Sequence, residues 1–250
     1  MLEDRVALVG GGVVMPVTSE RMAALRRILE RHSLFGCLIV AELDQLSSRA
    51  RIESYRARQE IFQKGSPGQG LLAVLKGKVR IGSLGPDGGL IVLNMMNEGD
   101  VFGEIALLDG KARTADAVAV TDCELVAIDR RDFVPFVRAN PEVALRLLGV
   151  LCERLRHTTE QVEDVVFLDA PARLAKRLLQ LAGTEDKPAR SGSATVVTIS
   201  QRELGSMIGL SRESINKQLA AWQHDGMIKV EQGTITILDA AALQHRVDAL

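Results

Sequence analysis

The spacing of apolar positions changes along the chain, and each change predicts a different kind of element. Apolar residues recur at helical spacing from Glu20 to about Arg31, and a second helical segment covers Ala41 to Ser48. Over residues 51–128 the pattern becomes short apolar runs separated by Gly, Pro and Asp turns. The runs are IESY, EIF, LLAVLKG, KVRIGSL, LIVLNMM, AVAV and CELVAI. Many short strands at this spacing are typical of an antiparallel sandwich or barrel.

A long helix follows Asn140-Pro141, and its apolar positions form a seam. The seam steps alternately by 3 and 4 residues through Leu145, Leu148, Cys152, Leu155, Thr159, Val162 and Val166. This heptad spacing is typical of a coiled coil, because it keeps one stripe of the helix facing a partner helix. The pattern favours a helix that forms a homodimer. A helix packed against its own domain is the alternative.

The residues after this seam helix predict a second, smaller domain. Asp169 is suited to cap a new helix, with Pro171 in its first turn, and that helix covers Ala172–Ala182. A polar loop, Gly183–Ala194, separates it from the apolar run TVVTI, which reads as a strand.

Two short helices and a hairpin complete this domain. Ser200 opens a Ser-x-x-Glu capping box, and the helix that follows ends at Gly209. Ser211 opens a second helix, which Gly226 closes. The segment MIKVEQGTITIL then reads as two strands turned at Gly233. Two helices joined by a turn, followed by such a hairpin, predict a winged helix-turn-helix.

The fold class is therefore α+β, with an antiparallel β-domain, a long helix and a winged helix-turn-helix. The expected domains are 20–140, 141–169 and 170–250, preceded by a mobile extension over residues 1–19. The run VALVGGGVVMP in that extension is short for a signal-peptide core and lacks a convincing cleavage site. Met15 is a second candidate for the initiator.

Composition describes a globular protein whose C-terminal part is basic. The chain is 46% hydrophobic and 25% charged, and no apolar run reaches membrane-spanning length. Residues 170–230 hold nine Lys or Arg against five Asp or Glu, whereas residues 141–169 hold three against six. A basic module indicates nucleic acid as a partner. Aromatic residues are only 3% of the chain, which argues against stacking on single-stranded bases.

Cysteines and histidines give no sign of a catalytic or metal centre. Cys37, Cys123 and Cys152 lie too far apart for a metal-ligand cluster, and an odd number does not suggest a disulfide framework. A reducing cytoplasm is the simple interpretation. His32 and His157 read as single residues on helix surfaces. Because no nucleophile is grouped with a base, we do not expect an enzyme.

The string FGEIALLDGKARTA, from Phe102 to Ala115, carries the candidate ligand chemistry. A turn led by Gly103 exposes backbone N–H groups that suit a phosphate. Arg113 is able to clamp phosphate oxygens through two parallel hydrogen bonds. Glu104, nine positions earlier, suits a sugar hydroxyl. The alternative is a surface ion pair between Glu104 and Arg113 beside a β-turn.

This string resembles the phosphate-binding cassette of cyclic-nucleotide-binding domains, found in the catabolite activator family of bacterial regulators and in eukaryotic kinase regulatory subunits. The resemblance implies that Arg113 holds the cyclic phosphate and Glu104 the ribose 2′-hydroxyl, while Gly103 permits close backbone approach. Further contacts are implied for Ile105, Ala106 and Thr114.

Two adjacent threonines on the long helix are candidates for reading the base. Thr159 is the polar position of the seam, which costs stability and so invites a functional reason. We expect Thr158 to contact the ligand of its own subunit and Thr159 to reach the partner's ligand. A threonine methyl that packs acceptably, or one that sets the register, is the alternative.

The second helix of the helix-turn-helix carries polar residues near its start that suit DNA. Arg212, Glu213, Asn216 and Lys217 share one face, where recognition helices meet base edges. Arg and Lys suit guanine, and Glu suits the cytosine amino group. A helical hairpin packed in a core is the alternative. Residues suited to phosphate contacts are Ser200, Gln201 and Ser211.

The order of these modules and the strings LDAPARLAKRLLQLA and SRESINKQLAAWQHDGMI resemble the Crp/Fnr superfamily over about residues 20–240. The resemblance implies a β-roll or jelly-roll nucleotide domain and a homodimer that reads a pseudo-palindromic operator. Arg212 and Glu213 match the family's guanine and cytosine readers. Lys217 stands where the best-known member has Arg, so recognition there is expected to differ. The loop 183–194 occupies the position where the family's activators touch RNA polymerase.

The favoured ligand is cAMP, and cGMP is the alternative. The resemblance keeps cGMP open because a Thr directly after the cassette arginine, here Thr114, is associated with cGMP recognition in related kinases. Bound ligand is expected to order Val162–Asp169 and so reorient the recognition helices. A ligand-independent relative is a further alternative. A nucleotide-signalling module without DNA function would leave the Arg212–Lys217 face unexplained.

Overall fold

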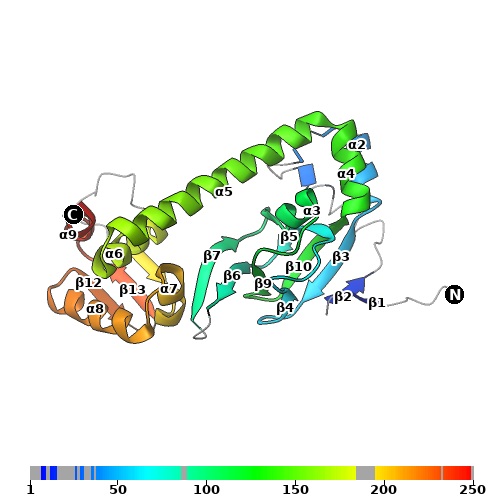
Figure 1. Cartoon of the computed structure of the whole chain (residues 1–250). Helices are drawn as coiled ribbons and strands as arrows, with labels where there is room; N and C mark the ends of the chain where they lie inside the picture. Colours follow the sequence, from blue (N-terminus) through cyan, green and yellow to red (C-terminus); the bar gives the residue numbers. More distant parts are fainter. Residues whose placement is uncertain are drawn as a thin grey trace. The chain divides into compact units, whose positions relative to one another are not determined.

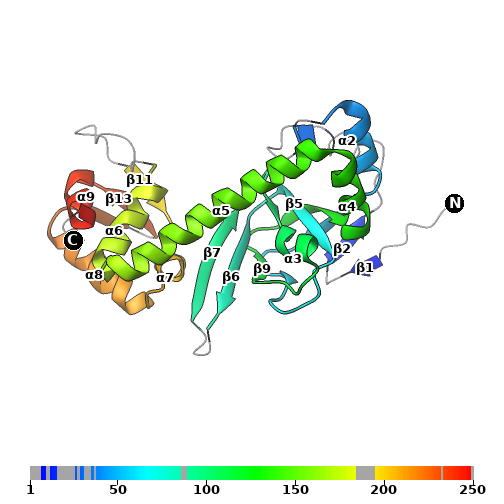
Figure 2. The same ribbon diagram turned by 45° about the horizontal axis from the view of Figure 1, so that its top comes forward.

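The structure is a computed structural model of the 250-residue chain. It describes residues 7–9, 12–15, 26, 29–30, 35–36, 38–85, 89–183, 195–231 and 233–248. The chain divides into two compact units. The first unit comprises Met1–Ser83 and Leu93–Arg154, and the second comprises Leu84–Val92 and Leu155–Leu250. Figures 1 and 2 show the elements in two views.

Two antiparallel sheets form most of the first unit. One sheet has the order β1-β2-β3-β10-β5-β8 and the other β4-β9-β6-β7, with the tips of β6 and β7 grouped with the second unit. The strands of the first sheet are β1 (Ala7–Val9), β2 (Gly12–Met15), β3 (Arg51–Tyr55), β5 (Gly70–Lys76), β8 (Val101–Phe102) and β10 (Cys123–Asp129). Those of the second are β4 (Glu60–Phe62), β6 (Val79–Leu84), β7 (Leu90–Met96) and β9 (Asp116–Ala119). The predicted α+β class with an antiparallel β-domain is confirmed.

Strand β5 is buried on both of its faces. Its alternating side chains divide between two cores. Leu72 and Val74 join the cluster between the sheets, while Leu71 and Ala73 join the cluster on the outer face. Helices α2 (Val40–Ser47) and α4 (Arg130–Ala139) and the start of α5 (Pro141–Phe167) contribute to the outer cluster.

The N-terminal residues differ from the sequence prediction. Strands β1 and β2 pair as a hairpin, and β2 pairs antiparallel with β3, with Val14 opposite Glu53. A mobile extension is therefore wrong for residues 7–9 and 12–15. In the sequence Gly10 and Gly11 separate two apolar runs, which is hairpin composition, and β3 offers an edge for pairing. The predicted helix Glu20–Arg31 lies mostly outside the described residues.

The second unit has the predicted winged helix-turn-helix order. Its sheet has the order β11-β13-β12, and Trp222, Ile215 and Leu219 of α8 are buried against it and its neighbours. Asp169 accepts a hydrogen bond from Ala172 N at 2.8 Å, as the capping pattern predicts. The elements are α6 (Ala170–Leu181), β11 (Thr195–Thr198), α7 (Gln201–Ile208), α8 (Arg212–His224), β12 (Ile228–Glu231), β13 (Thr234–Ile237) and α9 (Ala240–Asp248).

Candidate nucleotide and DNA sites

The cassette string folds into strand β8, a left-handed glycine and the short helix α3 (Glu104–Asp109). Gly103 is the N-cap of α3 at φ +82°, a conformation that residues with a Cβ rarely adopt. The backbone is also crowded at Gly68, where a Cβ would lie 2.2 Å from the Ala106 Cβ. These close approaches bring the start of α3 against the turn after β4 and next to Arg113.

Arg113 is held inside this cradle, with only 8% of its surface exposed. Its Nη1 donates to the Gly103 carbonyl at 2.7 Å, and its Nη2 donates to the Gly70 carbonyl at 3.0 Å. Among the described residues its Nε has no hydrogen-bond partner. Burial lowers the pKa of the Arg113 guanidinium, while the charge of Glu104 raises it. A buried guanidinium with an unmatched N–H is suited to an anionic ligand.

Glu104 is 1% exposed, and its carboxylate pairs with Arg154 of α5 rather than with Arg113. Arg154 also donates to the Val101 carbonyl. The second carboxylate oxygen, Glu104 Oε2, is buried without a partner among the described residues. Within the described part of the chain, Glu104 and Arg113 are both buried and form no ion pair with each other, so the surface-pair alternative is wrong. An orphaned carboxylate oxygen is suited to accept from a sugar hydroxyl.

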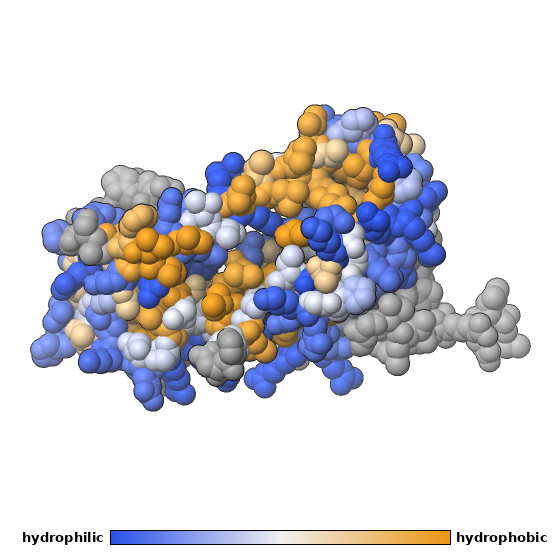
Figure 3. Space-filling model, in the orientation of Figure 1, coloured by the Kyte–Doolittle hydropathy of each residue, from blue (hydrophilic) through white to orange (hydrophobic). Residues whose placement is uncertain are grey.

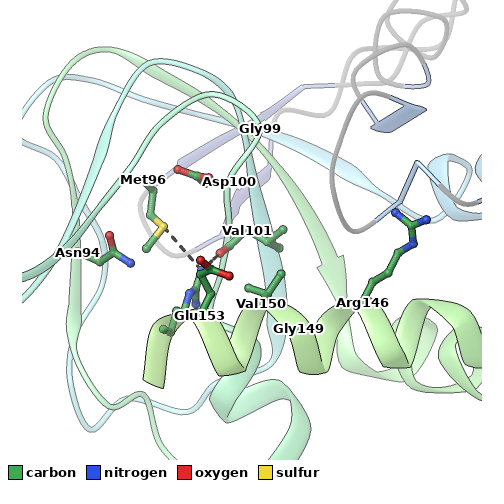
Figure 4. A pocket seen from close by; sticks show the side chains of 10 residues that line it. Asn94, Met96, Gly99, Asp100, Val101, Arg146, Gly149, Val150 and Glu153 are labelled. Carbon is green, nitrogen blue, oxygen red and sulfur yellow. Dashed lines mark hydrogen bonds between the residues drawn. The ribbon is translucent and has the colours of Figure 1, made fainter. Parts of the chain in front are cut away.

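A cavity of about 480 Å³ adjoins this carboxylate–arginine pair in the first unit. Figure 4 shows side chains around it from β7, the following turn, β8 and α5. The Met96 sulfur accepts from Arg154 Nη2 at 3.7 Å. The volume of the cavity falls within the range of small-molecule sites. Glu104 and Arg113 are not among its lining residues, so Arg154 is the link between cavity and cassette. The lining is Asn94, Met96, Gly99, Asp100, Val101, Arg146, Gly149, Val150, Glu153 and Arg154.

The helix-turn-helix presents the predicted polar face. Ser200 and Ser211 cap α7 and α8, each accepting from a backbone N–H at 3.1 Å. Ile215 turns into the core and orients α8. The opposite face of α8 is exposed and carries Arg212, Glu213, Asn216 and Lys217.

Comparisons with known proteins match the two domains that carry these candidate sites. The family model described as a cyclic nucleotide-binding domain matches residues 52–140, and the Crp-like helix-turn-helix domain matches residues 172–246. A CRP-like cAMP-activated global transcriptional regulator of Mycobacterium tuberculosis is 35% identical over 224 residues, which cover 88% of this chain and 98% of that protein. The chain belongs to the Crp/Fnr superfamily of transcription regulators.

Other superfamily members extend this comparison. The cyclic AMP receptor protein of Thermus thermophilus is 34% identical, with 85% of this chain and 95% of that protein covered. The crystal structure of the Thermus thermophilus catabolite activator protein has a TM-score of 0.50 at 33% identity, covering 87% of this chain and 99% of that chain. The c-di-GMP responsive regulator CLP of Xanthomonas campestris shares the fold, with a TM-score of 0.70 at 24% identity and coverage of 80% and 99%.

As a superfamily member the chain is a DNA-binding transcription regulator with a cyclic-nucleotide-binding domain. The relatives from Mycobacterium tuberculosis and Salmonella typhimurium are named as transcriptional regulators rather than enzymes. Within the described part of the chain, no group of three His, Cys, Asp or Glu side chains is arranged to hold a metal ion. No described helix is both long and apolar enough to cross a membrane.

The structure brings only some of the sequence-predicted site residues together. Ala106 is buried in the cradle, whereas Ile105 and Thr114 are exposed. Thr158 and Thr159 lie on the part of α5 that belongs to the second unit, and both are exposed. The Thr159 hydroxyl donates to the Leu155 carbonyl at 2.9 Å, so its oxygen remains available mainly as an acceptor.

Arg154 and Phe62 are site residues that the sequence reasoning missed. Arg154 precedes Thr158 by one helical turn on α5, and a buried acid such as Glu104 requires a cationic partner. That requirement is the signal that could have found Arg154. Phe62 lies beneath Arg113, with the guanidinium carbon 4.2 Å from the ring centroid, and nothing in the cassette string indicates it.

Proposed function

We propose that this superfamily member is a cAMP-responsive regulator that acts as a homodimer in the cytoplasm and binds a pseudo-palindromic DNA site. The observation that carries the ligand proposal is the pair of unmatched buried atoms, Arg113 Nε and Glu104 Oε2. One is a cationic donor and the other an anionic acceptor. A cyclic phosphate fused to a ribose offers the complementary groups on one small molecule.

In this proposal Arg113 clamps the cyclic phosphate, and the start of α3 supplies backbone N–H groups to it. Gly103, Ile105 and Ala106 form that start, and Thr114 follows Arg113 on the other side. Glu104, held by Arg154, accepts from the ribose 2′-hydroxyl. The adjoining cavity provides volume for part of the ligand.

Dimerisation through α5 is supported by a stripe of exposed apolar side chains. Leu145 is 63% exposed and Val162 is 58% exposed, although both belong to the heptad seam. Figure 3 shows an apolar surface over the first half of α5. Exposed apolar stripes of this kind mark interaction surfaces, and a heptad repeat fits a second copy of the same helix. The other exposed seam residues are Leu148, Cys152, Leu155 and Val166.

Thr158 and Thr159 are proposed to read the base, Thr158 within its own subunit and Thr159 across the dimer. Since Thr159 is also a seam position, the ligand would bias the packing of the two α5 helices. Differential binding to two such packings would order Val162–Asp169 and reorient the recognition helices.

On DNA, Arg212 and Glu213 are proposed to read guanine and cytosine, and Asn216 and Lys217 to contact neighbouring bases. Ser200, Gln201 and Ser211 would contact phosphates. RNA polymerase is a proposed further partner, through the region of residues 183–194.

The choice of cAMP over cGMP rests on two relatives that are named for cAMP, from Mycobacterium tuberculosis and Thermus thermophilus. Thr114 is the residue that keeps cGMP as the competing ligand. Calorimetry with both nucleotides therefore decides this point, and tighter binding of cGMP would reverse the assignment.

The site itself is tested by changing Arg113 to Ala. The expected result is a loss of cAMP affinity of at least about 10-fold, because a charge-assisted phosphate contact is removed. Arg131→Ala is the matched control, because Arg131 has 82% of its side chain exposed and loses the same charge. Unchanged cAMP affinity in Arg113→Ala would overturn the cassette assignment.

The switch is tested by fluorescence anisotropy on a duplex selected by the protein from a random pool. DNA affinity is expected to rise when cAMP is added, and less so with cGMP. Equal DNA affinity without ligand and with each nucleotide would identify a ligand-independent member. Failure to bind any duplex would contradict the DNA proposal.

A further inference from the structure

We propose that Phe62 is a positioning residue for the nucleotide site, because its ring holds the Arg113 guanidinium in the orientation that receives the phosphate. This inference rests on the proposed function, since it assigns the phosphate to Arg113. An aromatic ring at position 62 then sets nucleotide affinity without touching the nucleotide.

The planar guanidinium of Arg113 is held by hydrogen bonds along one edge and by an aromatic ring against one face. Its two terminal nitrogens donate to the carbonyls of Gly103 and Gly70, which fixes the edge. Its central carbon lies 4.2 Å from the centroid of the Phe62 ring, which supports a face. A planar cation over an aromatic ring is attracted by the ring quadrupole, and the attraction grows when both are removed from water. Rotation of the guanidinium would break these contacts together.

The position of the Phe62 ring is itself determined by its surroundings. Strand β4 pairs with β9, and the register shifts between Glu60 and Phe62, so that Phe62 lies opposite Ala117. Arg113 N donates to the Ser66 carbonyl at 2.9 Å, which brings the turn after β4 alongside the arginine backbone.

A second aromatic ring supports the first from behind. The centroids of Phe62 and Phe102 are 5.9 Å apart at an angle of 39°, and Phe102 is 1% exposed. Phe102 directly precedes Gly103, whose carbonyl accepts from Arg113. The aromatic pair therefore fixes the Phe62 ring that lies against the guanidinium. It also fixes the end of β8, which leads into the Gly103 carbonyl that accepts from Arg113.

This arrangement requires a guanidinium group at position 113, and not only a positive charge. A lysine would retain the positive charge, but it has no planar group to stack on the ring and no fork to reach two carbonyls. The effect of Phe62 should therefore depend on the guanidinium at position 113. That dependence separates a positioning role from a general contribution to the core.

The test is a double-mutant cycle measured by calorimetry with cAMP on the full chain. Phe62→Leu should weaken cAMP binding by about 3- to 30-fold, whereas Phe62→Tyr, which keeps the ring, should stay within about 2-fold of wild type. In an Arg113→Lys background, Phe62→Leu should cause no further loss. Ile61→Ala is the control for core loosening, because Ile61 is buried in the same cluster on the same strand.

Two results would overturn the proposal. One is wild-type affinity in Phe62→Leu, and the other is an equal loss in the wild-type and Arg113→Lys backgrounds, which would place the ring in the core alone. A ligand-free readout separates this failure from failure of the proposed function. The Arg113 Nε–H proton resonance, assigned with Arg113→Lys, should carry an upfield ring-current shift that Phe62→Leu removes. If wild type bound no cyclic nucleotide, this shift would still decide whether the contact exists.

Discussion

Replacing Gly103 by Ala should damage the nucleotide site, whereas the same substitution at Gly65 should leave the site intact. Gly103 has φ +82°, and a Cβ there would lie 2.4 Å from Arg113 Nη1 and 3.1 Å from the Gly70 carbonyl oxygen. The new methyl group therefore occupies the position of the guanidinium. Arg113 must leave the contacts that now orient it.

The structure separates two contributions to the expected loss of stability. An L-residue in the left-handed region costs about 1–2 kcal/mol. Displacing Arg113 from a carbonyl costs roughly a further 1.5–3 kcal/mol, the usual range for a hydrogen bond to a charged group. Gly103→Ala should therefore lower the free energy of unfolding by about 2.5–5 kcal/mol. If the displaced guanidinium no longer meets the phosphate, cAMP affinity should fall by about 10- to 100-fold.

Gly65→Ala is the matched control. Gly65 has φ +85°, but a Cβ there meets no atom within 4 Å. Its N–H donates to the Arg113 carbonyl at 2.8 Å, a bond that alanine retains. This variant should lose only the conformational contribution of about 1–2 kcal/mol in urea titrations and keep its cAMP affinity. Equal cAMP affinities for the two variants, measured by calorimetry, would refute the steric reasoning.

Three further predictions concern the DNA unit, the seam and pH. Gly205→Ala should impair DNA binding in anisotropy assays while cAMP binding persists, because the new Cβ would lie 2.5 Å from the Leu210 carbonyl oxygen in the turn between α7 and α8; unchanged DNA affinity would contradict this packing. Mild oxidation should produce a disulfide-linked dimer on non-reducing gels through the exposed seam residue Cys152. Absence of a dimer band, or a band that persists in Cys152→Ser, would contradict pairing at this seam position. The hydrogen bond from Arg51 lowers the pKa of the Asp129 carboxyl in the folded protein. The ionised carboxylate therefore stabilises the fold at pH values above the pKa that Asp129 has in the unfolded chain, and this stabilisation is lost as pH falls below about 4. The stability gap between wild type and Asp129→Asn should therefore narrow from pH 7 to acid in denaturant titrations, and a constant gap would exclude the linkage.

Periodic patterns were sufficient to predict most of the fold. The strands from β3 to β10 except the two-residue β8, the seam helix and the winged helix-turn-helix follow from local spacing and caps, such as the bond from Ala172 N to Asp169. Helix α3 was read as a turn, because six residues are too few to establish a helical period. The hairpin of β1 and β2 was missed, because its pairing partner β3 lies about forty positions further along the chain.

The candidate site was predicted only as far as one continuous string carries it. Glu104 and Arg113 lie in that string, and their chemistry is readable from residue type. Arg154 and Phe62 meet them only because the chain folds back, across sequence separations of 50 and 51 residues. Their roles depend on burial, which a lone sequence does not display. A buried carboxylate requires a cationic partner, and a buried guanidinium requires groups that hold it in place. The sequence alone does not show which residues provide these contacts.

The charges in the cassette explain why its ligand should be an anion that links two elements. Two guanidinium groups, Arg113 and Arg154, share the buried region with one carboxylate, Glu104, which forms its ion pair with Arg154. Arg113 has no ion-pair partner among the described residues, and its charge is supported by two carbonyl dipoles, an aromatic face and the nearby charge of Glu104. Leaving such a charge unpaired is unfavourable, and a phosphate is the group that would correct it. A nucleotide whose phosphate contacts Arg113 and whose ribose contacts Glu104 would therefore also be coupled to α5. The coupling would pass through the Glu104 carboxylate, because its ion-pair partner Arg154 belongs to that helix.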